Sequence, residues 1–187
     1  MTGGALCCLM LWAASSGSAL SAAPVPISPG EVRGLTEDRA LLAGKLTVVI
    51  FLSARCPVSN TYGERFQRLY DDYQTRGVRF FFVNSNVNET ETEISRNAAE
   101  HGFTFPIFRD AGARAADRFV AQATPEIFLL DAEAQVRYRG ALDDAQNPAR
   151  IHRHAVREAL DQMLAGVPVT VSEIKSFGCT IKRPRKL

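Results

Sequence analysis

The chain has 187 residues, of which 46% are hydrophobic and 22% charged, and its formal net charge is +2. This length suits one domain with tails, and the composition is that of an ordinary globular protein. A net charge so close to zero gives no broad basic surface, so it argues against nucleic acid or a membrane surface as the main partner.

The N-terminal segment predicts export. The first thirty residues carry no charged side chain, and the apolar run ALCCLMLWAA within them is of signal-peptide length and too short to span a membrane. Small residues follow the run, so we predict a signal peptide over residues 1–23 and localisation to the periplasm or cell envelope, with no stable membrane insertion after cleavage. No Lys or Arg precedes the run, and a buried or membrane-anchoring segment is the alternative.

The cysteines set the central question of the sequence. Four are present, and the two in the predicted leader would be lost on cleavage. The remaining pair, Cys56 and Cys179, would most simply form one disulfide in an exported protein. The predicted organisation is a domain over residues 24–166 and a tail over residues 167–187 that carries Cys179. The tail has no clear periodicity, and we expect its basic end, KRPRKL, to be solvated and disordered.

Hydrophobic patterning predicts alternating strands and helices. Residues 46–52 form a continuous β-branched apolar run, which is typical of a strand covered on both faces. The predicted elements in chain order are a helical turn (37–44), a strand (46–52), a helix (57–77), a strand (78–85), a helix (89–102), an extended segment (103–110), a helix (111–122), two strands joined by a turn (126–140) and a helix (148–166). This order predicts an α/β fold, a three-layer α/β/α sandwich around a mixed central sheet.

Cys56 stands at the junction between a buried strand and a helix. The first turn of a helix presents unpaired N–H groups and a partial positive charge, and both stabilise a thiolate. A free thiol has a pKa near 8.5, which helix N-termini lower to about 3.5–7.5. Pro57 suits the first helical position, and Arg55 adds a nearby cation. The pattern favours a reactive thiol; a buried, inert cysteine is the alternative.

A second proline stands before another apolar strand. Pro125 follows Thr124, which indicates a strand edge or a cis peptide bond. Taken together, the motifs FLSARCPVSNTY, ATPEIFLLD, VRYRGALDD and FGCTIKR resemble those of the thioredoxin-like superfamily, and within it the redoxin (AhpC/TSA-like) proteins of bacterial envelopes. The resemblance implies a thioredoxin-like fold with Cys56 as the attacking thiol. It also implies that Thr124 and Pro125 form a cis-proline loop whose backbone pairs with a substrate disulfide.

Three departures from related motifs narrow the chemistry. Ser59 replaces the second cysteine of a thioredoxin Cys-x-x-Cys motif. Val49 and Ser53 occupy the Pro and Thr places of the peroxiredoxin motif, which puts peroxide activation in doubt. Asn60 replaces the second cysteine of the Cys-x-x-x-Cys motif of copper-delivery relatives.

Two further polar groups have simple structural explanations. His152 and His154 lie two apart in the predicted last helix, so they face different sides and we expect surface groups rather than metal ligands. Asp143 and Asp144 are expected in a solvated turn before that helix.

The predicted activity is thiol–disulfide exchange, with Cys56 as nucleophile and Cys179 as the remaining candidate to resolve the mixed disulfide. Gly178 would let the Cys179 segment approach closely. We predict no organic cofactor and no metal, and a protein thiol or disulfide, or a small oxidant, as partner. Two alternatives stay open: a peroxiredoxin-like thiol peroxidase, and a non-catalytic thioredoxin-fold binding module in which a Cys56–Cys179 disulfide is structural.

Overall fold

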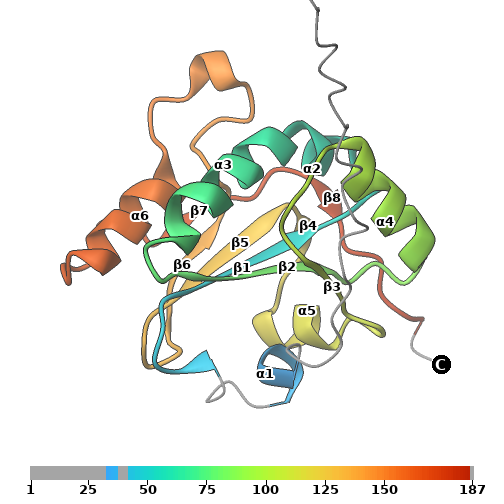
Figure 1. Ribbon diagram of the computed structural model, residues 1–187, viewed down its shortest axis with the longest axis horizontal. Helices are drawn as coiled ribbons and strands as arrows, with labels where there is room; N and C mark the ends of the chain where they lie inside the picture. Colours follow the sequence, from blue (N-terminus) through green and yellow to red (C-terminus); the bar gives the residue numbers. More distant parts are fainter. Residues whose placement is uncertain (1–32, 38–41, 186–187) are drawn as a thin grey trace, which may run out of the picture.

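A computed structural model describes residues 33–37 and 42–185 of the protein. Its central sheet has six strands in the order β3-β2-β1-β5-β6-β7 (Figure 1). Its strands are β1 (Thr47–Leu52), β2 (Arg79–Asn84), β3 (Ile107–Arg109), β5 (Glu126–Leu130), β6 (Val136–Gly140) and β7 (Glu173–Ile174). Strands β1, β2 and β3 are parallel, whereas β5 is antiparallel to both β1 and β6. The sheet is therefore mixed, as predicted. A separate two-stranded ladder joins β4 (Ala123–Thr124) to β8 (Cys179–Thr180).

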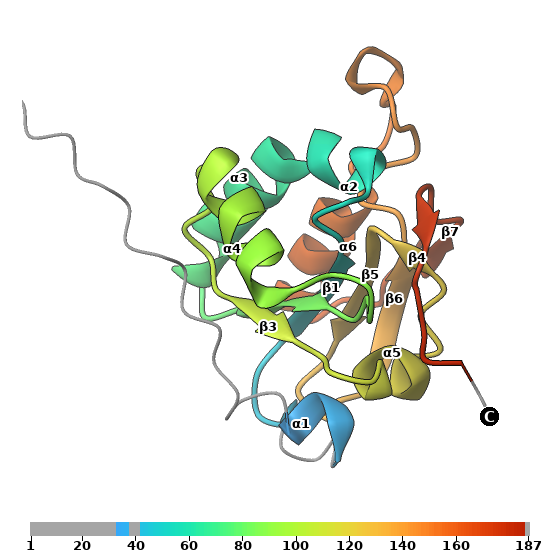
Figure 2. The ribbon, with the colours of Figure 1, turned by 90° about the vertical axis from the view of Figure 1, so that its right-hand side faces the viewer.

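Helices cover both faces of this sheet, as Figures 1 and 2 show from two directions. One face carries α2 (Pro57–Thr61), α3 (Gly63–Gln74), α4 (Glu91–Glu100) and α6 (Ala155–Leu164). The other face carries α1 (Arg33–Thr36) and α5 (Arg114–Phe119). The expected three-layer, thioredoxin-like α/β/α arrangement is confirmed.

The apolar run of β1 explains why the sheet has two covered faces. All six residues of β1 are buried. Val48 and Ile50 pack into the core under α3, α4 and α6, whereas Val49 and Phe51 pack into the second core with α1 and α5. Alternate side chains of a strand point to opposite faces, so a strand inside a three-layer domain must be apolar at every position.

Two predicted helices have different bounds in the structure. The helix that follows Cys56 is divided at Tyr62 into α2 and α3. The predicted helix over residues 148–166 is wrong in its first half. A 3-10 helix at Pro148–Arg150 is followed by extended backbone, and α6 begins only at Ala155. The intervening backbone pairs with Asp144, which accepts from the His152 amide and donates its own amide to the Arg153 carbonyl.

The described part of the C-terminal tail, residues 167–185, is ordered, which contradicts the expected disorder, whereas Lys182, Pro184 and Arg185 are exposed to solvent as expected. Strand β7 pairs with β6, and β8 pairs with β4. The Lys182 amide donates to Asn86 Oδ1 at 2.8 Å, and Arg183 pairs with Asp117 at 2.7 Å. These partners lie far away in the sequence, so local periodicity could not reveal them. Figure 2 shows the tail running down the edge of the domain.

The predicted signal peptide and residues 38–41 of the predicted helical turn lie outside the described residues. Within the described ranges, no helix combines the length and apolar character that crossing a membrane requires.

Candidate active site

Cys56 lies at the start of α2, where the sequence placed it. It is the N-cap residue of α2, Pro57 follows in the first turn, and the Ser59 amide donates to Cys56 Sγ at 3.4 Å. The side chain is buried, with 1% exposure. Arg55 does not point its charge at the sulfur, because its guanidinium pairs with Glu93 at 2.5 Å. The Arg55 cation therefore pairs with Glu93 and not, as the sequence had suggested, with the Cys56 thiolate.

The second sulfur arrives from the other end of the chain. Cys56 Sγ and Cys179 Sγ are 2.8 Å apart, and both side chains are free thiols. The backbone of Cys179 pairs with Thr124 in the antiparallel β4–β8 ladder. A Cβ atom on Gly178 would lie 1.9 Å from the Thr124 carbonyl oxygen, so this approach requires glycine. The two thiols are placed to form a disulfide with each other.

The Thr124–Pro125 peptide bond is cis, in agreement with the sequence prediction. As a thiol, Cys56 donates to the Thr124 carbonyl oxygen at 3.1 Å. The Thr124 hydroxyl donates to the Cys179 carbonyl oxygen at 3.4 Å. All four residues singled out from the sequence therefore meet at one place, although their catalytic roles are a separate question.

The environment favours ionisation at Cys56 over Cys179. Burial raises the pKa of the Cys56 thiol, but hydrogen bonds from the Cys179 thiol and the Ser59 amide outweigh it, so the net pKa is lowered. The Cys179 pKa is raised to about 11, first because its thiol donates to Cys56 and second because it is partly buried. The largest single stabilisation of the Cys56 thiolate thus comes from the second thiol, ahead of the Ser59 amide of the helix.

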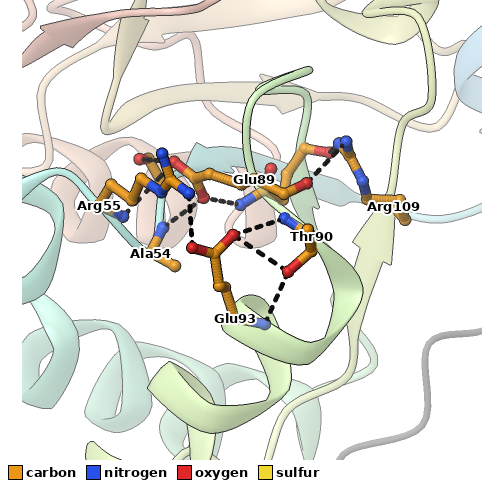
Figure 3. A network of polar contacts seen from close by, with 8 residues as sticks. Ala54, Arg55, Glu89, Thr90, Glu93 and Arg109 are labelled. Carbon is orange, nitrogen blue, oxygen red and sulfur yellow. Dashed lines mark hydrogen bonds and ion pairs between the residues drawn. The ribbon is translucent and has the colours of Figure 1, made fainter.

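Sequence reasoning missed a buried carboxyl group beside the site. Glu89 is 3% exposed, and Figure 3 shows it next to Ala54 and Arg55 of the loop before Cys56. It accepts from the Ala54 amide at 2.8 Å, from Asn84 Nδ2 at 2.7 Å and from the Ser53 hydroxyl, with a longer contact of 3.4 Å to the Arg55 amide. The sequence contained a signal: Asn84 and Glu89 follow the carboxyl end of a parallel strand, where site residues of open α/β sheets gather.

A neighbouring carboxylate, Glu93, acts on the same loop from outside. It forms a capping box with Thr90 at the start of α4 and pairs with Arg55, as Figure 3 shows. The Thr90 backbone amide, followed by Arg55, lowers the Glu93 pKa to about 2. Glu89 and Glu93 together attach the Cys56 loop to the β2–α4 segment.

A small polar cavity reaches both sulfurs. It has a volume of about 240 Å³ and is lined by Cys56 and Cys179 together with Ser53, Arg55, Asn86, Asn88, Glu89, Thr180 and Lys182. Such a space admits a small molecule but not a folded chain, since drug-sized sites occupy about 300–1,000 Å³.

The acidic pair before α6 differs from expectation. Asp143 is buried rather than solvated, and it accepts from Arg65 at 2.6 Å and contacts His154 Nδ1 at 2.8 Å. His154 is the N-cap of α6 and not a helical residue, so the helical argument for its direction was wrong, although its side chain is 62% exposed. Over residues 33–37 and 42–185, no group of three or more His, Cys, Asp or Glu side chains could hold a metal ion.

Comparison with known proteins agrees with this geometry. The chain is 27% identical over 120 residues to the thiol-disulfide oxidoreductase YkuV of Bacillus subtilis (strain 168), which covers 62% of this chain and 81% of YkuV. A crystal structure of a conserved, uncharacterised protein from Geobacillus kaustophilus is 30% identical, with a TM-score of 0.72 over 81% of this chain and 82% of that one.

Two other structures extend the comparison. A hypothetical protein of Sinorhizobium meliloti 1021 is 30% identical with a TM-score of 0.68, over 75% of this chain and 81% of that one. A thioredoxin-like protein in its oxidised form, at 24% identity and a TM-score of 0.56 over 69% and 84% of the two chains, shares the fold. Residues 33–139, which include Cys56 and the cis-proline loop, match the AhpC/TSA family, and the chain therefore belongs to that family.

Proposed function

We propose that the protein is a thiol–disulfide oxidoreductase that uses Cys56 as its nucleophile and Cys179 as its resolving thiol. The single observation that carries this proposal is the 2.8 Å contact between the two sulfurs beside the cis-proline loop. The similarity to an oxidoreductase from Bacillus subtilis supports the same reaction class, with protein thiols or disulfides as the substrates.

The chemistry follows from the ionisation order. The Cys56 thiolate attacks one sulfur of a substrate disulfide, forms a mixed disulfide and releases the other substrate sulfur as a thiolate. Cys179, once deprotonated, then attacks Cys56 Sγ and releases the second substrate thiolate. The substrate disulfide gains two electrons, and the two protein thiols lose them to form a Cys56–Cys179 disulfide. A donor dithiol reduces that disulfide and completes the cycle.

The raised pKa of Cys179 gives the two thiols different roles. Cys179 keeps its proton while Cys56 is a thiolate, so the first attack comes from Cys56. When the mixed disulfide forms, Cys56 no longer carries a negative charge, and the main cause of the raised Cys179 pKa disappears. Resolution therefore becomes favourable only after the first step has occurred.

Peroxide reduction is the weaker candidate. Ser53 stands in the place of the peroxiredoxin threonine, and its hydroxyl donates to Glu89 rather than to the Cys56 sulfur. No hydroxyl at that position is therefore directed at an oxidant bound to Cys56. A stopped-flow reaction with hydrogen peroxide that is no faster than that of free cysteine would agree with this ranking.

Site variants test the main proposal. We expect Cys56→Ser to lose the reduction of an insulin disulfide while its melting temperature stays near that of the wild type. Cys179→Ser should instead accumulate a mixed disulfide at Cys56, which mass spectrometry detects. Full activity in Cys56→Ser would refute the proposal. A Cys56–Cys179 potential far below about −300 mV would mark a structural staple instead.

We further propose that the protein acts outside the cytoplasm, on the basis of the uncharged, apolar residues 1–23. An oxidising compartment would suit a pair of cysteines that alternates between dithiol and disulfide. The N-terminal sequence of the protein isolated from the cell envelope tests this, and an intact residue 1 in that material would contradict cleavage.

A further inference from the structure

We propose that the C-terminal strand β8 occupies the docking edge of a protein substrate and must leave that edge before a protein disulfide can reach Cys56. The inference rests on the proposed function and adds a form of regulation to the same site. It makes the tail both the internal competitor of a protein substrate and the carrier of the resolving thiol.

The geometry of β8 is that of a bound extended peptide. Thr124, which precedes the cis-proline, pairs with Cys179 in antiparallel register, and Ala123 pairs with Thr180. An extended segment that adds to a sheet edge gains affinity from main-chain hydrogen bonds of this kind. The sulfur of the bound segment lies 2.8 Å from Cys56 Sγ, where a substrate sulfur would have to lie. Only one chain can occupy the Thr124 edge at a time.

Burial shows how completely the tail closes this edge. Cys56 is 1% exposed, and the remaining approach is the cavity of about 240 Å³ that Thr180 and Lys182 of the tail help to line. A small disulfide or oxidant fits such a space, whereas a polypeptide with its flanking residues does not. The closed tail therefore discriminates by size at the same sulfur.

The anchors of the tail let β8 leave without releasing the whole segment. Upstream, β7 is part of the main sheet through β6. Downstream, Ile181 is 3% exposed in the second core, and its amide donates to the Gln122 carbonyl oxygen at 3.0 Å. Between Ile174 and Ile181 the only ladder is the two-residue strand β8. A short segment tethered at both ends can open, and its local concentration remains high, so it returns quickly.

This arrangement couples resolution to product release. While a substrate strand holds the Thr124 edge, Cys179 is displaced from Cys56. The return of β8 brings Cys179 Sγ back to Cys56 Sγ and, in the same movement, removes the substrate from the edge. The disulfide that then forms holds the tail closed until a donor reduces it.

The test uses the full chain in a Cys179→Ser background, so that Cys56 is the only thiol of the described site and Cys179 cannot resolve the mixed disulfide in any variant. Gly178→Ala should push β8 off Thr124, because its Cβ would lie 1.9 Å from the Thr124 carbonyl oxygen. Ile181→Ala weakens the downstream anchor independently. Lys175→Ala is the matched control, since that side chain is exposed and upstream of the strand.

The measured quantity is the rate of mixed-disulfide formation at Cys56, with insulin as the protein disulfide and 2-hydroxyethyl disulfide as the small one. If the closed tail limits access, Gly178→Ala and Ile181→Ala raise the insulin rate by about tenfold or more, in proportion to the open fraction. The 2-hydroxyethyl disulfide rate does not rise, because Cys56 loses the donor at position 179 when the tail opens, and Lys175→Ala changes neither rate.

Each other outcome has a definite meaning. The proposal that β8 blocks the docking edge is overturned by either of two results: an insulin rate that both variants leave unchanged, or a rise that is equal for both disulfides. If Gly178→Ala does not fold, Ile181→Ala decides alone. If neither disulfide reacts with Cys56 in any variant, the proposed function itself fails. That result differs from one in which both disulfides react but opening β8 has no selective effect.

Discussion

Glu89 is the group outside the sulfur pair on which the site geometry depends most. Its carboxyl group joins Ser53 and Ala54, in the loop before Cys56, to Asn84 at the end of β2. Replacement by alanine removes the acceptor for all of these donors, and the Ser53, Asn84 and Glu89 side chains are buried. We therefore expect Glu89→Ala to lower both the free energy of unfolding and the reactivity of Cys56.

The magnitude follows from the donors that lose their partner. A buried donor left unsatisfied costs about 1–3 kcal/mol, and three donors contact Glu89 closely. The Ser53 hydroxyl and the Asn84 amide can turn toward other acceptors, whereas the Ala54 backbone amide cannot. We therefore expect a loss of about 3–5 kcal/mol, a large part of the 5–15 kcal/mol of a typical domain. For a chain of this size, that loss lowers the melting temperature by roughly 10 °C.

Two measurements separate stability from positioning. Urea unfolding gives the free energy, and the pH dependence of iodoacetamide alkylation gives the Cys56 pKa. Glu89→Gln keeps the shape and one acceptor oxygen, so it should lose about 2 kcal/mol, roughly half as much. Because the loop is then less well held, the alkylation curve of Cys56 should shift along the pH axis even in the folded Glu89→Gln protein.

Glu93→Gln is the matched control. Glu93 contacts the same loop through the exposed Arg55 side chain, and glutamine can also complete a capping box. Its unfolding free energy at pH 7 should fall by less than that of Glu89→Gln, because solvent screens the pair with exposed Arg55, and its Cys56 titration should stay close to that of the wild type. If Glu89→Gln and Glu93→Gln behave alike, or if neither alters the Cys56 titration, the positioning role of Glu89 is refuted.

Three further outcomes are expected. Cys179→Ala removes the hydrogen bond that lowers the Cys56 pKa, so the Cys56 alkylation midpoint should rise; an unchanged midpoint would contradict the assigned cause. The Glu93 pKa is held at about 2, so the stabilisation by its carboxylate is present above the pKa of the unfolded chain and is lost as the pH falls toward 2. Between pH 4.5 and 2 the wild type should therefore lose stability that Glu93→Gln does not lose. Thermal melts over this pH range measure the difference. Ser59→Cys in the Cys179→Ala background should restore a disulfide, seen by mass spectrometry, because position 59 already contacts Cys56 Sγ through its amide.

The parts of the fold and site that could be predicted from the sequence are those whose signals lie within a few neighbouring residues. Strand β1 and the hairpin from β5 to β6 were predictable because their signals are local: β1 and β5 are continuous buried runs, and a short turn joins β5 to β6. Cys56 was recognisable because its setting, a buried strand followed by Pro57, is local. Thr124 and Pro125 were recognised from the adjacent strand together with the resemblance to the thioredoxin-like superfamily.

Long-range contacts account for what could not be predicted. Thr124 and Cys179 are 55 positions apart, and a two-residue ladder leaves no period to detect. Glu89 looked like an acidic residue at the start of a helix, because its burial depends on four groups from two other segments. Asp143 looked like a turn residue because Arg65, its partner, lies 78 positions earlier in the chain.

The origin of the second sulfur has a consequence for how the site works. In a Cys-x-x-Cys motif both thiols belong to one short helical turn, so their separation is fixed by local geometry. Here Ser59 holds the local position, and its hydroxyl accepts from the Ser53 amide at 3.2 Å, so that position contributes to the structure of the loop. The resolving thiol belongs instead to a strand whose pairing with Thr124 is only two residues long. The Cys56 pKa, the access of a substrate and the resolution of the mixed disulfide then depend on the same movement of β8. When the tail opens, Cys56 loses its largest stabilising donor, the Cys179 thiol. We therefore expect Cys56 to react fastest with small molecules while the tail is closed. We expect it to react with proteins only when they displace β8.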